Sequence, residues 1–215
     1  LGAGAAHRLG LAGKPKDAAG SKSAKPTRDE LLEKLRGVRL AIVDLGNACW
    51  RHRHFTEDIQ TRQYRSPEVI LGQGYDTSAD IWSLGCMAFE LMTGDLLFEP
   101  KVGENYSRDE DHLAQCIELL GRFPKKMMRD GSNAREFFSS KGELRHIHHL
   151  KMWPLEEVLQ QKYYFEKEVA EQAADFLRKL LMLRPSERVT AADALDHPFL
   201  RQDPKDDDGV FELAK

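Results

Sequence analysis

The chain has 215 residues, of which 41% are hydrophobic and 31% charged, and its formal net charge is −3. These values are typical of a globular protein with one sizeable core, and the charge is too small to indicate a nucleic-acid surface. No apolar stretch approaches the ~20 residues that cross a bilayer. The three cysteines form no C-x-x-C pair, so we expect a reducing, intracellular location without a disulfide framework or a zinc site.

Residues 1–29 consist largely of Gly, Ala, Lys and Ser and contain no aromatic residue. Such a segment cannot bury enough apolar surface to offset the entropy lost on ordering, so we expect a disordered N-terminal tail. Gly2-Ala3-Gly4 does not begin a G-x-G-x-x-G phosphate loop, because the third position is His7 and no strand precedes it. The chain opens with Leu1 and has no Met before Met87, which predicts a fragment of a longer protein.

A short strand and a loop are predicted next. Residues 38–43, Val-Arg-Leu-Ala-Ile-Val, are largely apolar and β-branched, and predict a buried strand that ends at Asp44. Residues 47–65 are polar and have no sustained period, which predicts a loop.

Four helices are predicted from apolar spacing and from their end signals. The first begins at Thr77, which forms a capping box with Asp80, and ends at Gly94. Its apolar residues cover nearly every face, so we expect it to be buried all round. The other three span about 109–120, 167–183 and 190–197. The result is a mainly α domain with little sheet, and no repeat of about 20–50 residues supports a solenoid.

Three short motifs occur in one order at close spacing: Asp44-Leu45-Gly46, Ser66-Pro67-Glu68 and Asp80-Ile81-Trp82-Ser83-Leu84-Gly85. Together they resemble the C-terminal lobe of a protein kinase, in which Asp-Phe-Gly and Ala-Pro-Glu bracket the activation segment. Leu45 replaces the Phe and Ser66 replaces the Ala. No Val-Ala-x-Lys, glycine-rich strand-turn-strand or His-x-Asp-x-x-x-x-Asn motif precedes Asp44.

Longer strings narrow the resemblance. Residues 44–50, 54–65 and 107–112 are similar to the SR-protein kinases, which phosphorylate serines in Arg-Ser repeats of splicing factors. The similarity covers about residues 30–202. It implies an incomplete kinase fold, with a protein-kinase-like C-terminal lobe over 30–215 and the activation segment at 44–68. Residues 1–29 resemble the end of the low-complexity spacer that interrupts the kinase domain in this family.

The resemblance assigns roles to four residues of the kinase core. Asp44 would be a ligand of the Mg²⁺ that bridges the phosphates of ATP. Arg188 would pair with Glu68, and Asp80 would accept hydrogen bonds from the backbone of the catalytic loop. The catalytic base, an Asp, is expected upstream, so no catalytic residue is assigned within this chain.

Acidic residues are expected to dock an arginine-rich substrate, because Arg-carboxylate pairs are charge-assisted and often bidentate. Asp111 and Glu118 are seven residues apart on one predicted helix, and hence about 10 Å apart along one face. By resemblance they form a docking groove with Asp95 and Lys162, whose contacts would be between exposed charges. The alternative interpretation is an ordinary solvated helix face.

A basic pocket is implied by a second set of residues, Arg62, Arg65 and Arg108. In this family such a pocket receives a phosphate or carboxylate near the residue being modified. The activation segment also contains Thr56 and Thr61, but by resemblance it is active without phosphorylation. A histidine cluster lacks an accompanying Cys or carboxylate at ligand spacing, so we interpret its members as surface or packing residues: His146, His148 and His149.

Two functions are consistent with these observations. The first is a serine/threonine kinase that uses ATP and Mg²⁺ and acts on Arg-Ser-rich splicing factors, in the cytoplasm and the nucleus, as a monomer that binds neither nucleic acid nor membrane directly. The second is a non-catalytic fragment that docks Arg-Ser-rich proteins. We expect negligible phosphoryl transfer from these 215 residues alone, because one metal ligand cannot replace the catalytic base and the phosphate-positioning lysine.

Overall fold

The structure is a computed structural model, and it describes residue 30, residues 33–34 and residues 38–201. The described residues fall into two units, one that ends at Phe55 and one that runs from Thr56 to Arg201, and each is described by itself. The tail expected at 1–29 lies outside the described residues. None of the described helices is long and apolar enough to cross a membrane.

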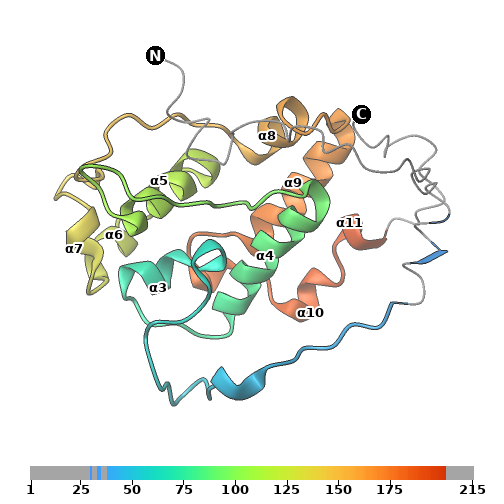
Figure 1. Cartoon of the computed structure of the whole chain (residues 1–215), viewed down its shortest axis with the longest axis horizontal. Coiled ribbons are helices and arrows are strands. Elements are labelled where there is room, and N and C mark those ends of the chain that lie inside the picture. Colours follow the sequence, from blue (N-terminus) through green and yellow to red (C-terminus); the bar gives the residue numbers. More distant parts are fainter. Residues whose placement is uncertain (1–29, 31–32, 35–37, 202–215) are drawn as a thin grey trace, which may run out of the picture. The chain divides into compact units, whose positions relative to one another are not determined.

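Helices dominate the described part of the chain, which confirms the mainly α fold class (Figure 1). In chain order the 3₁₀ turns (η) and α-helices are η1 Leu45–Asn47, η2 Arg62–Tyr64, α3 Pro67–Leu71, α4 Ser78–Thr93, α5 Arg108–Leu120, α6 Met127–Asp130, α7 Ala134–Phe137, α8 Leu155–Gln161, α9 Lys167–Leu180, η3 Pro185–Glu187, α10 Ala191–Ala194 and α11 Pro198–Arg201. Extended pairing within the described residues is limited to two isolated bridges, Trp50 with Arg53 and Phe138 with Leu144.

The strand predicted at residues 38–43 does not occur in the described chain, and this prediction is wrong. These residues run irregularly to Asp44, with Leu40 92% and Ile42 89% exposed. A strand needs a neighbour that takes up its backbone hydrogen bonds and covers its apolar face. The described residues up to Phe55 supply neither, so a segment of high β-propensity stays irregular.

Helix α4 has nearly the predicted ends, but its N-terminal cap differs. The Asp76 carboxylate accepts hydrogen bonds from the backbone N–H of Ser78 at 2.9 Å and from the Ser78 hydroxyl at 2.6 Å. Thr77 already has helical backbone angles, and its side chain makes no capping bond. The predicted Thr77–Asp80 capping box is therefore wrong. At the other end, Gly94 has a φ of 77°, the left-handed conformation that commonly terminates helices.

Helix α4 is buried on one face only, and the prediction of burial all round is wrong. Trp82 and Phe89 are almost completely buried. By contrast, Leu84, Met87 and Leu91 lie on one side of the helix and form an exposed apolar stripe, with Leu91 81% exposed. In the described part of the chain α4 packs mainly against α9, η2 and η3, and these elements leave the stripe uncovered.

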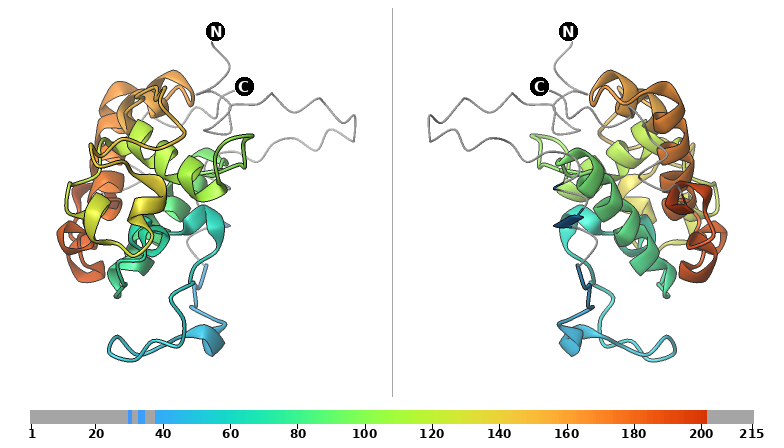
Figure 2. Two further views of the ribbon diagram at one scale, coloured as in Figure 1. Left: turned by 90° about the vertical axis from the view of Figure 1, so that its left-hand side faces the viewer. Right: turned by 90° about the vertical axis from the view of Figure 1, so that its right-hand side faces the viewer.

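Helix α9 packs against both α4 and α8 (Figures 1 and 2). Its Ala173 and Leu177 are fully buried, as the amphipathic spacing of the predicted 167–183 helix required. Gly85 allows α4 to approach closely, since a Cβ added there would lie 2.8 Å from Leu181 Cδ2. Because Gly85 has no side chain, α4 can pack closely against the C-terminal end of α9.

Helices α5 and α10 carry end signals that the sequence already shows. The Ser107 hydroxyl accepts a hydrogen bond from the backbone N–H of Glu110 at 3.1 Å and so caps α5, which ends at Gly121. Thr190 caps α10 in the same way, accepting from the N–H of Asp193 at 3.2 Å. Local capping thus fixes where these two helices begin.

Candidate functional site

Asp44, the expected metal ligand, lies in the unit that ends at Phe55. It precedes η1 in the left-handed conformation, with φ 60° and ψ 51°, which residues other than glycine adopt rarely. The residue is exposed, and a Cβ added at Gly46 would lie 3.9 Å from its Oδ1. An exposed carboxylate on such a turn can provide one oxygen ligand for Mg²⁺.

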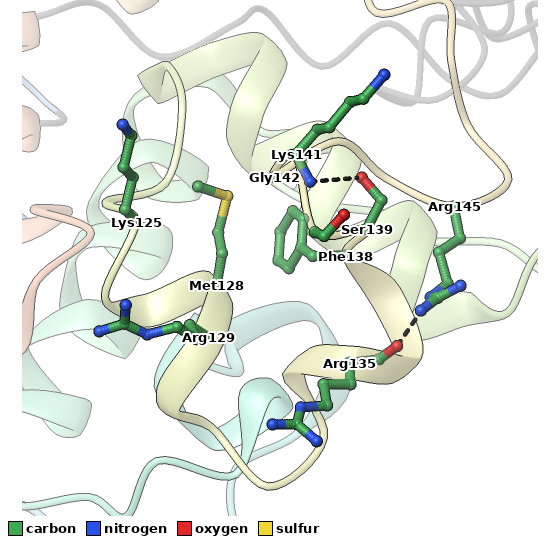
Figure 3. Close-up of a pocket in the computed structure, with 10 residues that line it drawn as sticks. Lys125, Met128, Arg129, Arg135, Phe138, Ser139, Lys141, Gly142 and Arg145 are labelled. Atoms are coloured by element: carbon green, nitrogen blue, oxygen red, sulfur yellow. Dashed lines mark hydrogen bonds between the residues drawn. The ribbon is translucent and has the colours of Figure 1, made fainter.

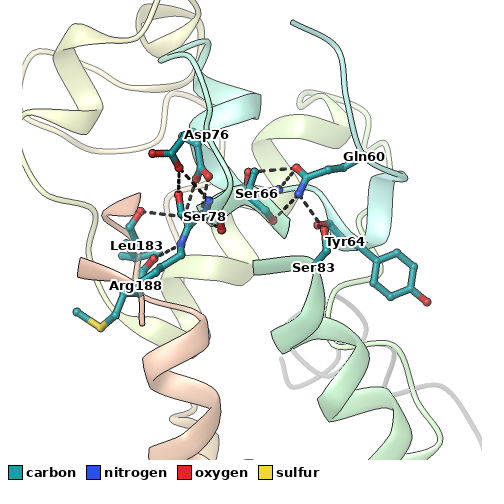
Figure 4. A network of polar contacts seen from close by, with 11 residues as sticks. Gln60, Tyr64, Ser66, Asp76, Ser78, Ser83, Leu183 and Arg188 are labelled. Atoms are coloured by element: carbon teal, nitrogen blue, oxygen red, sulfur yellow. Dashed lines mark hydrogen bonds and ion pairs between the residues drawn. The ribbon is translucent and has the colours of Figure 1, made fainter. Parts of the chain in front are cut away.

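Glu68 and Arg188 form a buried, bidentate ion pair that joins distant parts of the second unit. Arg188 Nη1 and Nη2 each donate to a Glu68 carboxylate oxygen at 2.6 Å, and the two side chains are 0% and 1% exposed. Arg188 also donates to the carbonyl oxygens of Met182 at 2.8 Å and Ser78 at 3.0 Å. Its guanidinium carbon lies 5.0 Å from the centroid of the Trp82 ring. One arginine thus connects α3, the start of α4 and the segment after α9 (Figure 4).

Asp80 is in the first turn of α4, where a carboxylate favours the positive end of the helix dipole. The residue as a whole is exposed, but its carboxyl group is partly shielded from water, which raises the pKa of that group. The role expected of Asp80 involves a catalytic loop that is not recognisable in this sequence.

Gln60 organises the end of the activation segment, and no sequence pattern singled it out. Its side-chain Nε2 donates to the Ala79 carbonyl at 2.7 Å and to the Ser83 hydroxyl at 2.8 Å. Its Oε1 accepts from the Ser66 N–H at 2.9 Å and from the Ser66 hydroxyl at 3.1 Å, while its own carbonyl accepts from Arg65 Nη2 at 2.9 Å. The residue has a positive φ of 68°. One side chain therefore fixes the activation segment to α4 (Figure 4).

Arg65 and Arg108 lie near enough to Arg62 for their charges to act on its guanidinium. Arg62 is ion-paired with Asp109 at the start of α5, and Arg65 pairs with Asp58 at 2.8 Å. Burial lowers the pKa of the Arg62 guanidinium, and the charges of Arg65 and Arg108 lower it further. Asp109 and Asp58 offset part of this positive charge, and the guanidinium groups retain N–H donors that suit the oxygens of an anion.

Asp111 and Glu118 lie on one face of α5, but the expectation that their charges are exposed is wrong. Asp111 is 1% exposed and Glu118 is 0% exposed. Asp111 Oδ2 accepts hydrogen bonds from the Lys101 N–H and from the Gln115 amide, both at 2.9 Å. Glu118 Oε1 accepts from the Lys151 N–H at 2.9 Å. These carboxylates are buried because the segments before and after α5 fold over the helix and use them as acceptors for backbone N–H groups.

Asp95 and Lys162 are in direct contact near the surface. Lys162 Nζ and the Tyr163 hydroxyl each donate to Asp95 Oδ2 at 2.9 Å, and half of the Asp95 side chain is exposed. Partial burial raises the pKa of Asp95, but the hydrogen bonds from Lys162 and Tyr163 outweigh that effect and the net shift is downward. Asp95 is therefore the accessible carboxylate of the expected docking set.

Among the clustered histidines, His146 contacts a buried carboxylate of α5. His146 donates its backbone N–H to Glu110 Oε1, and its ring Nδ1 lies 2.7 Å from Glu110 Oε2. Within the part of the chain that the structure describes, no group of three or more His, Cys, Asp or Glu side chains could hold a metal ion. Another histidine, His112, is fully buried 5.1 Å from the Phe98 ring, and burial with two nearby arginines lowers its pKa to about 3.

Comparison of the sequence with known proteins identifies the family of the chain. The model of the protein kinase domain matches residues 30–200. The chain is 57% identical over 163 residues to SRSF protein kinase 3 of Homo sapiens, a match that covers 76% of this chain and 29% of that protein.

Two further relatives come from distant organisms. The chain is 53% identical over 165 residues to Protein kinase dsk1 of Schizosaccharomyces pombe, which covers 77% of this chain and 30% of the relative. It is 52% identical over 178 residues to Serine/threonine-protein kinase SRPK of Physarum polycephalum, which covers 82% and 42%. The chain thus spans less than half the length of these curated relatives.

Proposed function

Because the chain belongs to the protein kinase family, and within it to the SR-protein kinases, we propose that it serves as the C-terminal lobe of a serine/threonine kinase. The proposed reaction transfers the γ-phosphate of ATP to serines in Arg-Ser repeats of splicing factors. One observation carries the proposal: the 52–57% identity to relatives named as kinases, two of them in words that specify SRSF or SRPK kinases.

Asp44 fits the Mg²⁺ of this reaction as one ligand out of several. Its carboxylate is exposed on a tight turn, and hard oxygen donors are what Mg²⁺ prefers. When bound, Mg²⁺ neutralises charge on the phosphates of ATP. The described residues offer no complete ligand set of their own, so Asp44 would hold the ion together with the nucleotide and with residues outside this chain.

The peptide would be held by two sets of residues of opposite charge. Arg62, Arg65 and Arg108 would receive a phosphate or carboxylate beside the serine being modified. Asp95 offers an accessible charge to the arginines of the repeat. Asp111 and Glu118, whose carboxylates are buried acceptors, would add negative potential behind it and fix the segments that border the groove, and Lys162 would orient Asp95.

Isosteric substitutions separate charge from folding in this groove. Asp111→Asn with Glu118→Gln keeps an oxygen acceptor for the Lys101 and Lys151 N–H groups while removing both charges. We expect titration calorimetry with an (Arg-Ser)₄ peptide to show about tenfold weaker binding, a loss of roughly 1.4 kcal/mol, and a further weakening as salt rises. Glu171→Gln, on the exposed side of α9, is the matched control. Unchanged affinity in the double variant would remove the docking assignment.

Phosphoryl transfer would require residues beyond these 215. The exposed stripe of Leu84, Met87 and Leu91 indicates a contact surface, because contiguous apolar patches on a protein surface commonly mark interaction sites. We propose that the remainder of the kinase domain covers it. The chain alone would then dock Arg-Ser-rich proteins without modifying them.

The proposed enzyme works as a monomer in the cytoplasm and the nucleus, the compartments in which splicing factors are made and used. Analytical ultracentrifugation and imaging of the tagged full-length kinase test these two proposals. A stable dimer, or exclusion from both compartments, would contradict them.

A further inference from the structure

A cavity of about 750 Å³ opens beside α6 and α7 in the unit from Thr56 to Arg201 (Figure 3). Five basic side chains line it: Lys125, Arg129, Arg135, Lys141 and Arg145. None of the described residues that line the cavity is acidic. The cavity shares no residue with the arginine cluster, with the docking residues or with the buried ion pair.

Most of this positive charge is not offset locally. In the described part of the chain, the side chains of Lys125, Arg135 and Lys141 make no ion pair. Arg129 Nε lies 3.1 Å from Asp130 Oδ1, so the charge of Arg129 is the one that a neighbouring carboxylate offsets. Arg145 Nε donates to the carbonyl oxygen of Arg135 at 2.8 Å, which satisfies one donor and leaves the charge. An anion of several charges would complement such a cavity.

The frame of the cavity is held in place before any ligand arrives. A tight hairpin closes with the Ser139 N–H donating to the Glu143 carbonyl at 2.8 Å and the Gly142 N–H donating to the Ser139 carbonyl at 2.9 Å. Gly142 has a φ of 77°, and a Cβ there would lie 2.8 Å from Met128 Cε. Phe138, which is buried, packs edge-on against Phe123 at 5.7 Å. A prearranged site loses less entropy when it binds.

The cavity combines an apolar middle with a charged rim. Figure 3 shows Met128 and Phe138 in the middle, with the basic side chains around them. Arginine forks suit the oxygens of a phosphate group, while the apolar middle suits the carbon atoms of a peptide. The volume is that of a ligand of drug-like size, which corresponds to a few residues of peptide.

We propose that this cavity binds phosphoserine in a phosphorylated Arg-Ser tract, the product of the kinase reaction proposed above, on which this inference rests. An unmodified Arg-Ser repeat carries one positive charge, so five basic side chains repel it. Each phosphoserine adds about −1.5 to −2 charges at pH 7, which makes the repeat negative. Phosphorylation therefore reverses the sign of the interaction, and the cavity distinguishes product from substrate while the acidic docking groove prefers the unmodified tract.

Two adjacent lysines provide the test. Lys125 lines the cavity and Lys126 does not, although both are exposed on the same loop. Fluorescence anisotropy with a synthetic, labelled (Arg-phosphoSer)₄ peptide should show binding to the full chain. Lys125→Glu should weaken it about tenfold, because a charge-assisted hydrogen bond to phosphate is lost and a carboxylate that repels phosphate enters the cavity, whereas Lys126→Glu, outside the cavity and in solvent, should change it less than about twofold. Arg135→Ala is a second cavity variant that removes no local ion pair.

The control ligands distinguish the sources of the anion and the two proposals. Binding of an (Arg-Glu)₄ peptide or of inorganic phosphate with the same affinity and the same dependence on Lys125 would show a general anion site and overturn the assignment to phosphoserine. Equal effects of Lys125→Glu and Lys126→Glu, or no binding at all, would also overturn it. The synthetic peptide needs no phosphoryl transfer, so a failure here leaves the test of docking with the unmodified (Arg-Ser)₄ peptide unaffected.

Discussion

Replacing Arg188 tests how far the second unit depends on one buried ion pair. Arg188→Met keeps much of the apolar stem but removes the guanidinium group that contacts Glu68 twice at 2.6 Å. The Glu68 side chain is only 1% exposed, so its charge would remain in the interior without a counter-ion. Breaking a buried pair in this way costs about 3–5 kcal/mol. The substitution also removes the hydrogen bonds from Arg188 to the Ser78 and Met182 carbonyls, and each contributes about 1 kcal/mol.

The total is a large part of the stability of an ordinary domain, which is about 5–15 kcal/mol. Urea unfolding followed by far-UV circular dichroism gives the free energy of unfolding by linear extrapolation. Fluorescence adds a local signal, because the Trp82 ring lies 5.0 Å from the guanidinium carbon. Arg188→Lys, which keeps the charge but not the fork, provides an intermediate variant if Arg188→Met is mostly unfolded.

The chain offers a matched control for this experiment. Arg178 Nη1 lies 2.6 Å from Glu156, the same distance as in the buried pair, but the two side chains are 45% and 33% exposed. Arg178→Met should therefore cost only about 0–1 kcal/mol. A double-mutant cycle with Glu68→Gln measures the coupling directly. If Arg188→Met cost no more than Arg178→Met, the reasoning from burial would be refuted.

Three further predictions concern packing, pH and the activation segment. Gly85→Ala should destabilise the chain by roughly 1 kcal/mol in urea unfolding, because overpacking against Leu181 costs about 1–3 kcal/mol and improved helix propensity returns about 1. His112, whose pKa is lowered to about 3 by burial, should make the chain lose stability as pH falls from about 6.5 towards 3, by up to about 1.4 kcal/mol per pH unit. His112→Phe should flatten that slope. Gln60→Ala should speed hydrogen exchange at the Ser66 amide about tenfold, because that amide loses its acceptor.

Each of these predictions has a clear contrary result. If Gly85→Ala raised the free energy of unfolding, the side chain of Leu181 would be able to move away from the added methyl group at little cost. For His112, stability falls with pH because the unfolded chain binds a proton near pH 6.5, whereas the folded chain does not bind it until a much lower pH. If the free energy of unfolding of His112→Phe depended on pH as steeply as that of the unaltered chain, the burial argument would be contradicted. Unaltered exchange at Ser66 would show that Gln60 does not hold the segment.

The predictions that succeeded from sequence rest on local chemistry. The helix predicted at about 109–120 matches α5, whose caps Ser107 and Gly121 act on their own helix. The amphipathic spacing around Leu177 identified α9, because one apolar face is sufficient to define a helix against a core. Local signals of this kind do not depend on what else the chain contacts.

The predictions that failed depended on contacts between segments distant in sequence. The apolar run at 38–43 lacks a neighbouring strand among the described residues. On α4, some apolar residues lie on a face that no described element covers. From sequence, Asp111 and Glu118 of α5 are predicted to be surface charges. They are buried because the segments that contain Lys101 and Lys151 fold over them. Gln60 has no distinctive spacing, and only its hydrogen bonds across 19 and 23 positions reveal its role.

A chimeric kinase gives the most direct test that this chain is the C-terminal lobe of an SR-protein kinase. Residues 30–201 replace the corresponding segment of the fission yeast relative, and transfer of phosphate to an (Arg-Ser)₄ peptide is measured with and without Mg²⁺. We expect Mg²⁺-dependent transfer that Asp44→Asn abolishes and that the exposed control Asp196→Asn preserves. A folded chimera that transfers no phosphate to the peptide, or phosphate transfer that persists in Asp44→Asn, would contradict the proposed function.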